Sequence, residues 1–114
     1  MATSSTTPST KQWIVIVPDH PGMLSKRKEV RDTHLSRLGP ILDSGFLKMG
    51  GAVLDEHPAE GEAPAMNGSA LIVCAESAQE IRDTLSKDIY ATSGVWNVEK
   101  AQITPFRCAI SRPL

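Results

Sequence analysis

The chain has 114 residues and a formal net charge of −1 at neutral pH, and aromatic residues make up 4% of it. This length suits one domain with a single hydrophobic core. The charge provides no large positive field for phosphates and the few aromatic rings offer no stacking surface, so the composition argues against nucleic acid as a partner. The longest apolar runs are too short to span a membrane, and we expect a cytoplasmic protein that does not bind membranes.

The N-terminus divides into an arm and the start of a domain. Residues 1–11 are rich in serine and threonine and contain few apolar side chains to repay the entropy of ordering, so we expect a disordered arm there and one domain over residues 12–114. The run Trp13–Val17 is continuous, largely β-branched and followed by Pro18. This pattern predicts a strand that is covered on both faces.

A helix is expected after the turn at residues 19–22. Ser25 is its predicted N-cap, and apolar residues at helical spacing continue to about Ser44. Pro40 lacks a backbone N–H and its ring crowds the preceding turn, so the helix should kink or break near Gly39.

The rest of the chain alternates strand and helix signals. A capping box, Ser77 to Glu80, opens a second helix that should run to about Lys87. Residues 55–67 lack periodicity and predict a loop. Three further strands are expected, over residues 46–54, 68–75 and 96–109, the last broken or bulged near Pro105.

The resulting order, βαββαβ, predicts a ferredoxin-like α+β fold. Four strands form an antiparallel sheet with both helices on one face. The other face would stay uncovered within one chain, so we expect a homodimer with two sheets packed face to face. Cys74 and Cys108 lie in apolar runs and are predicted to be buried and reduced, with a disulfide or a reactive thiol as the alternative.

Three polar residues share one stripe of the first predicted helix. Arg27, Arg31 and His34 lie at positions i, i+4 and i+7. Periodicity alone is most often explained by a solvated basic face. However, Asp88 follows the second helix, and a fold that brings the two helix ends together would set an imidazole beside a carboxylate, as general acid/base chemistry requires. The alternative for Asp88 is a residue that only ends a helix.

Other polar residues are weaker candidates. Tyr90 could donate a hydrogen bond to a substrate oxygen or pack in the core. His20 could line the mouth of a pocket or belong to a turn. A metal site built from His20, His34 and an acid lacks the H-x-x-x-H or C-x-x-C spacing of common sites, so we expect no metal.

Several of these residues also occur in the order and spacing of a known family. The chain resembles the YciI-like (YCII-related) family of dimeric α/β-barrel proteins from Trp13 to about Ile110. The matching residues are Asp19, Pro21, Lys26-Arg27, Arg31, His34-Leu35, Gly68-Ser69, Asp88, Tyr90, Gly94-Val95 and Pro105-Phe106.

The resemblance implies a homodimer in which His34 and Asp88 are the catalytic pair. The family includes a lyase that removes chloride from a chlorinated aromatic diol. We therefore expect a small cofactor-independent lyase or isomerase that performs elimination, dehydration, isomerisation or cyclisation on a small organic metabolite, such as a phenolic or carbonyl compound of a secondary pathway. Arg31 would bind a negative substrate oxygen, with Arg27, Tyr90 and His20 as further substrate contacts. The alternatives are a non-catalytic small-molecule binding or accessory protein with the same pocket, and a structural dimerisation module.

Overall fold

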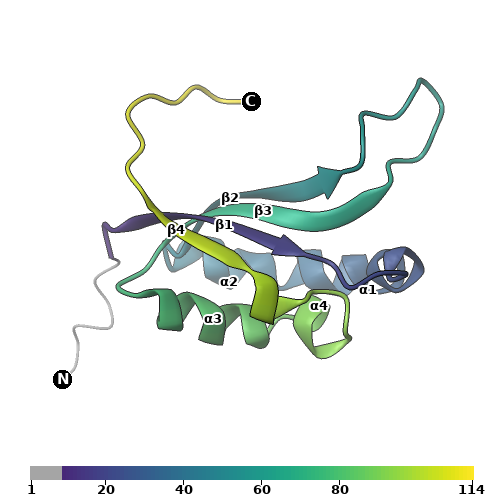
Figure 1. Cartoon of the computed structure of the whole chain (residues 1–114). Coiled ribbons are helices and arrows are strands. Elements are labelled where there is room, and N and C mark those ends of the chain that lie inside the picture. Colours follow the sequence, from purple (N-terminus) through teal and green to yellow (C-terminus); the bar gives the residue numbers. More distant parts are fainter. Residues whose placement is uncertain (1–8) are drawn as a thin grey trace.

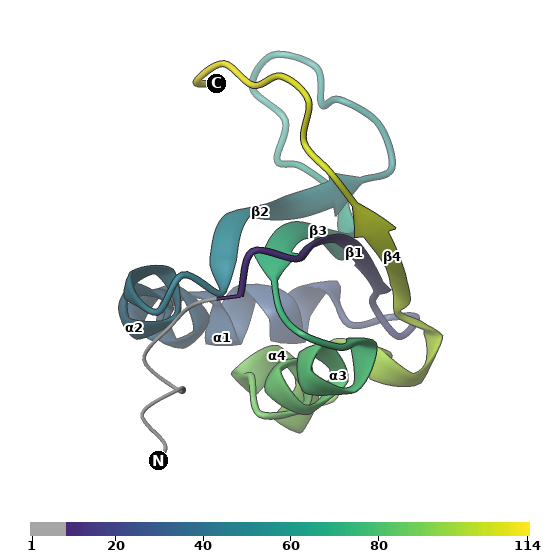
Figure 2. The ribbon, with the colours of Figure 1, turned by 90° about the vertical axis from the view of Figure 1, so that its left-hand side faces the viewer.

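The computed structural model describes residues 9–114, and its sheet confirms the ferredoxin-like fold (Figure 1). The four strands are antiparallel and lie in the order β2-β3-β1-β4. All the helices lie on one face of this sheet (Figure 2). The elements are β1 (Gln12–Pro18), α1 (Leu24–Ser36), α2 (Leu38–Asp43), β2 (Leu47–Leu54), β3 (Met66–Cys74), α3 (Ala78–Ser86), α4 (Ile89–Thr92), the 3-10 helix η2 (Val98–Lys100) and β4 (Gln102–Phe106).

The strand β1 shows how the two faces of the sheet differ. Val15 and Val17 point toward the helices and are fully buried, whereas Ile16 between them is 39% exposed. The prediction that this strand is covered on both faces is therefore wrong within one chain, because the helices cover only one side. We call the opposite side the outer face. Its apolar residues are Ile14, Ile16, Met49, Ala70, Ile72 and Phe106.

The first predicted helix is two helices, α1 and α2, which meet at Arg37. The predicted break is confirmed, and its cause is local. Pro40 has no N–H to donate to the carbonyl of Ser36, but it fits the first turn of a new helix, where N–H groups need no partner within the helix. The predicted cap is wrong: Met23 is the N-cap, and no side chain caps this end.

The second predicted helix is confirmed as α3. The hydroxyl of Ser77 accepts a hydrogen bond from the backbone N–H of Glu80 at 3.1 Å, as its capping box predicts. The short helix α4, which begins after Asp88, was not predicted. It is too short for hydrophobic periodicity to reveal.

The last strand is shorter than predicted, because residues 98–100 form a 3-10 turn and β4 ends at Phe106. After this residue the chain leaves the sheet (Figure 1), and Cys108 is exposed. Cys74 is buried as predicted, but the prediction that Cys108 is buried is wrong.

The predicted disordered arm falls mostly outside the described residues, which begin at Ser9. At its end, the carbonyl of Lys11 accepts a hydrogen bond from the N–H of Ala75 at 3.0 Å and so joins the chain to the domain. Within residues 9–114, no helix is long and apolar enough to cross a membrane.

Candidate functional site

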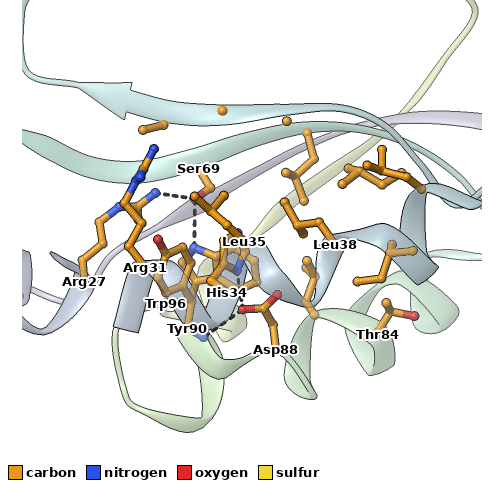
Figure 3. Close-up of a pocket in the computed structure, with 18 of the residues that line it drawn as sticks. Arg27, Arg31, His34, Leu35, Leu38, Ser69, Thr84, Asp88, Tyr90 and Trp96 are labelled. Atoms are coloured by element: carbon orange, nitrogen blue, oxygen red, sulfur yellow. Dashed lines mark hydrogen bonds and ion pairs between the residues drawn. The ribbon is translucent and has the colours of Figure 1, made fainter. Parts of the chain in front are cut away.

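The imidazole of His34 and the carboxylate of Asp88 meet on the helical side of the sheet (Figure 3). Nδ1 of His34 lies 2.8 Å from Oδ1 of Asp88, and both side chains are about one-eighth exposed. The same carboxylate oxygen accepts the backbone N–H of Tyr90 at 2.8 Å, because Asp88 is the N-cap of α4. The N-terminus of α4 therefore positions the carboxylate independently of its contact with His34.

This contact also fixes the tautomer of His34. An ionised carboxylate can only accept hydrogen bonds, so Nδ1 carries the proton that is shared with Asp88. In the neutral ring, Nε2 then keeps its lone pair and can accept a proton. The arrangement is that of a general base with an orienting carboxylate.

Two aromatic rings hold the imidazole in place. Tyr90 stacks on His34 with 4.0 Å between ring centroids and 15° between planes. Trp96 meets the same imidazole edge-on at 5.9 Å. Tyr90 is buried, and this burial raises the pKa of its phenol, so it stays protonated at neutral pH. The two rings restrict the imidazole to one orientation and add no charge beside it.

Arg27 is buried and already has protein partners. Its Nη1 donates to both carboxylate oxygens of Asp19 at 2.8 and 3.0 Å, and its Nη2 donates to the hydroxyl of Ser69 at 2.8 Å. The guanidinium also lies 4.7 Å from the ring centroid of Tyr90. Burial raises the pKa of Asp19, although the charge of Arg27 opposes this rise. Arg27 lines the cavity, but its guanidinium is mainly engaged in holding the surrounding residues together.

Ser69 is a site residue for which the sequence analysis predicted no role. Its Oγ accepts hydrogen bonds from Nη2 of Arg27 and, at 3.0 Å, from Nε1 of Trp96. These donors occupy both lone pairs, so the hydroxyl can act toward a ligand only as a donor. Gly68-Ser69 belongs to the pattern of the resemblance, but its position in an apolar strand gave no other signal.

Arg31 differs from Arg27 in being exposed and unpaired. Within residues 9–114, its side chain makes no hydrogen bond or ion pair, and the nearby Glu29 pairs with Lys26 instead. Its guanidinium is therefore free to meet a ligand.

A cavity of about 370 Å³ brings five of the six predicted site residues together. His20 is the exception. It is exposed and does not line the cavity, and its backbone N–H bonds to the carbonyl of Val95. No cluster of three potential metal ligands occurs in the part of the chain that the structure describes. The cavity lies between α1, α2 and the edge strand β2, and the predicted residues that line it are Arg27, Arg31, His34, Asp88 and Tyr90.

The sequence pattern of the YCII-related domain matches residues 12–107. The chain belongs to this family. The fold and the family that the sequence suggested are therefore confirmed.

Several curated relatives of this YCII-related chain are fungal proteins named for biosynthetic pathways or gene clusters. Fusaric acid biosynthesis protein 2 of Gibberella fujikuroi is 38% identical over 97 residues, which cover 85% of this chain and 93% of that protein. A protein of Fusarium oxysporum named aspartate kinase FUB3 is 38% identical over 102 residues, which cover 90% of this chain but only 19% of that longer protein.

A solved structure shares the fold of this YCII-related chain. It is the 5-chloro-2-hydroxyhydroquinone dehydrochlorinase TftG of Burkholderia phenoliruptrix, in complex with 2,5-dihydroxybenzoquinone. The TM-score is 0.70 at 24% identity, and the match covers 84% of this chain and 93% of the other.

Proposed function

We propose that this protein is a cofactor-independent lyase or isomerase that uses His34 and Asp88 for acid/base chemistry on a small organic molecule. The observation that carries the proposal is the 2.8 Å contact between these two side chains at a small-molecule-sized cavity. Phenolic or carbonyl metabolites of a secondary pathway are the proposed substrates.

In the proposed reaction, Nε2 of His34 removes a proton from an O–H or an activated C–H of the substrate. The electron pair that stays behind moves onto a substrate oxygen or expels a leaving group. The imidazolium then returns its proton to the leaving group or to another carbon, which regenerates the neutral base. This sequence produces elimination, dehydration, isomerisation or cyclisation without a redox partner.

The remaining polar groups stabilise the negative charge that develops. Asp88 faces the imidazolium and compensates its positive charge. Arg31 and the hydroxyl of Ser69 are both donors that line the same cavity, so we assign them to the substrate oxygen. Arg27 and Tyr90 act mainly as positioning residues, and we assign no role to His20.

The comparisons support this class of chemistry. Proteins named for fusaric acid biosynthesis indicate a small secondary metabolite, and the enzyme with the same fold is a dehydrochlorinase, whose name denotes an elimination. We propose by this analogy that the chain acts in the cytoplasm on a metabolite with an acidic proton.

We further propose that the active form is a homodimer whose outer faces pack together. Ile16, Met49 and Phe106 are each more than one-third exposed on this face of the sheet. A second copy would remove these side chains from water and cover the face that the helices leave open.

The test is turnover by variants of the pair on a panel of halogenated hydroquinones, hydroxy acids and β-dicarbonyl compounds. His34→Gln removes the base. Asp88→Asn preserves an acceptor for the backbone of α4 but presents an amide to His34, so it disturbs the tautomer. We expect each change to lower kcat by roughly 10²- to 10⁴-fold. His57→Gln is the matched control, because His57 is exposed in the loop between β2 and β3.

The outcome separates the proposed enzyme from its alternatives. If His34→Gln and Asp88→Asn keep full turnover while circular dichroism shows native folds, these two residues are not the working pair. If they change ligand affinity alone, the protein is a binding protein.

One observation favours an accessory role as the second candidate. The homologous segment forms only 19% of a protein named aspartate kinase, so a domain of this kind can accompany a larger enzyme. In that case the isolated chain would bind ligand at the same cavity but show no turnover with any member of the panel.

A further inference from the structure

The cavity beside His34 is polar at one end and mainly apolar over the rest of its length, where Thr84 is the polar exception (Figure 3) and its hydroxyl donates to the carbonyl of Glu80. In Figure 3, Arg31, Ser69 and His34 gather at one end, whereas Leu38 lies toward the other. We call the second part the apolar arm. It is lined by Leu38, Ile41, Phe46, Leu47, Leu71 and Leu85.

The pairing of β2 with β3 gives the arm its direction. Ala52 pairs with Ser69 at the polar end, and Gly50 pairs with Leu71 farther along the same face of the sheet. Two residues along a strand correspond to about 7 Å. The arm therefore continues for at least this distance beyond Ser69, toward the start of β2.

Gly50 keeps the arm open. Its φ is not positive, so the backbone does not require glycine here. A Cβ at this position would lie 3.0 Å from Cδ2 of Leu71 and 3.6 Å from Cδ1 of Leu47. A larger residue would therefore occupy the space between the sheet and the helices.

Arg31 and Ser69 determine which group of a ligand binds beside them at the polar end. The Ser69 hydroxyl can act toward a ligand only as a donor, because its lone pairs are used by Arg27 and Trp96. Arg31 can only donate and carries a positive charge. A ligand that satisfies both residues presents an acceptor oxygen, preferably an anionic one.

From these two ends we infer that the substrate is a small amphiphile. Its anionic or carbonyl oxygen binds Arg31 and Ser69, and an apolar tail lies in the apolar arm. This inference rests on the proposed function for the choice of this cavity as the substrate site, and it adds the substrate class. The volume of about 370 Å³ falls within the range of small-molecule sites.

The test is a ladder of saturated carboxylates, from butanoate to octanoate, titrated into the full chain by nuclear magnetic resonance. The indole N–H of Trp96 reports on the polar end, because it donates to Ser69. Burying one methylene contributes about 0.8 kcal/mol, so each added methylene should tighten Kd by about 4-fold until the arm is full.

Two neighbouring glycines provide the variant and its control. Gly50→Leu should weaken octanoate binding by at least tenfold and leave butanoate nearly unchanged. Gly51→Ala changes the same strand, but its new Cβ meets nothing within 4 Å, so its ladder should match that of the native protein. If Gly50→Leu does not fold, Gly50→Ala provides a smaller obstruction at the same point.

A Kd that does not depend on chain length in the native protein, or no binding at all, would overturn the inference. An unchanged ladder in a folded Gly50→Leu variant would also overturn it. Binding of an inert carboxylate needs no proton transfer, so His34→Gln should show the same dependence of Kd on chain length as the native protein. If His34→Gln shows the native dependence of Kd on chain length and also full turnover, the acid/base proposal is rejected, whereas the inference of an amphiphile site is still supported.

Discussion

The buried ion pair beneath the cavity gives a prediction that needs no substrate. Arg27→Met retains most of the apolar stem of Arg27 but removes the guanidinium. Asp19 then loses the guanidinium that binds its carboxylate while its side chain remains 6% exposed, and Ser69 loses one of its two donors. An unpaired buried carboxylate is far less stable than an exposed one.

The expected magnitude follows from these contacts. Removing one partner of a buried ion pair lowers the free energy of unfolding by about 3–5 kcal/mol. The lost contact with Tyr90 adds about 1 kcal/mol to this cost. Burial already raises the pKa of Asp19 in the native protein, and without Arg27 this pKa should rise further.

The sign of the pH dependence follows from proton binding. A carboxyl group whose pKa is raised by folding binds more protons in the folded than in the unfolded state. The free energy of unfolding therefore increases as the pH falls toward the pKa that this group has in the unfolded chain. The cost of Arg27→Met should therefore be smaller at about pH 5 than at about pH 7. Adding Asp19→Asn removes the buried charge, so the double variant should be more stable than Arg27→Met alone.

Urea unfolding followed by tryptophan fluorescence, at one fixed protein concentration, measures these differences. Lys26→Met is the control, because Lys26 is the neighbouring residue and pairs with Glu29 at the surface. Its cost should stay below about 1 kcal/mol. A cost below about 1 kcal/mol for Arg27→Met, or a cost that does not decrease at lower pH, would refute the reasoning.

Three further predictions address the fold and the assembly. Ile16→Lys places a charge on the outer face and should shift the proposed dimer to monomer in light scattering; a dimer that persists would locate the interface elsewhere. The native protein should react with a thiol reagent at exposed Cys108 within seconds to minutes and at buried Cys74 only on unfolding; mass spectrometry identifies the labelled site. Gly68→Ala should lower the melting temperature, because its Cβ would lie 2.8 Å from the carbonyl oxygen of Val17; an unchanged value would contradict this close approach.

Local signals in the sequence predicted most of the elements. The capping box at Ser77 and the missing N–H of Pro40 act within a few residues, so they located α3 and the break between α1 and α2. Signals failed where distant segments decide the outcome. Cys108 lies in an apolar run, yet it is exposed because the chain leaves the sheet after β4 (Figure 1).

The candidate site divides in the same way. The helical spacing of Arg27, Arg31 and His34 placed them on one stripe, but it could not show that Arg27 is held by Asp19 while Arg31 stays free. Ser69 was hidden in an apolar strand, because its role depends on donors that come from α1 and from the segment after α4.

The sequence by itself determined the order of strands and helices, the family, and the candidate pair His34 and Asp88. The order of the main elements follows from periodicity and caps, which are properties of neighbours along the chain, whereas the family and the candidate pair follow from the resemblance in residues and their spacing. Only the tertiary structure decided that α4 fixes the carboxylate against the imidazole at 2.8 Å, and that the cavity has a polar end and an apolar arm. Such features depend on how separate elements pack, because side chains far apart in the sequence must meet to form them.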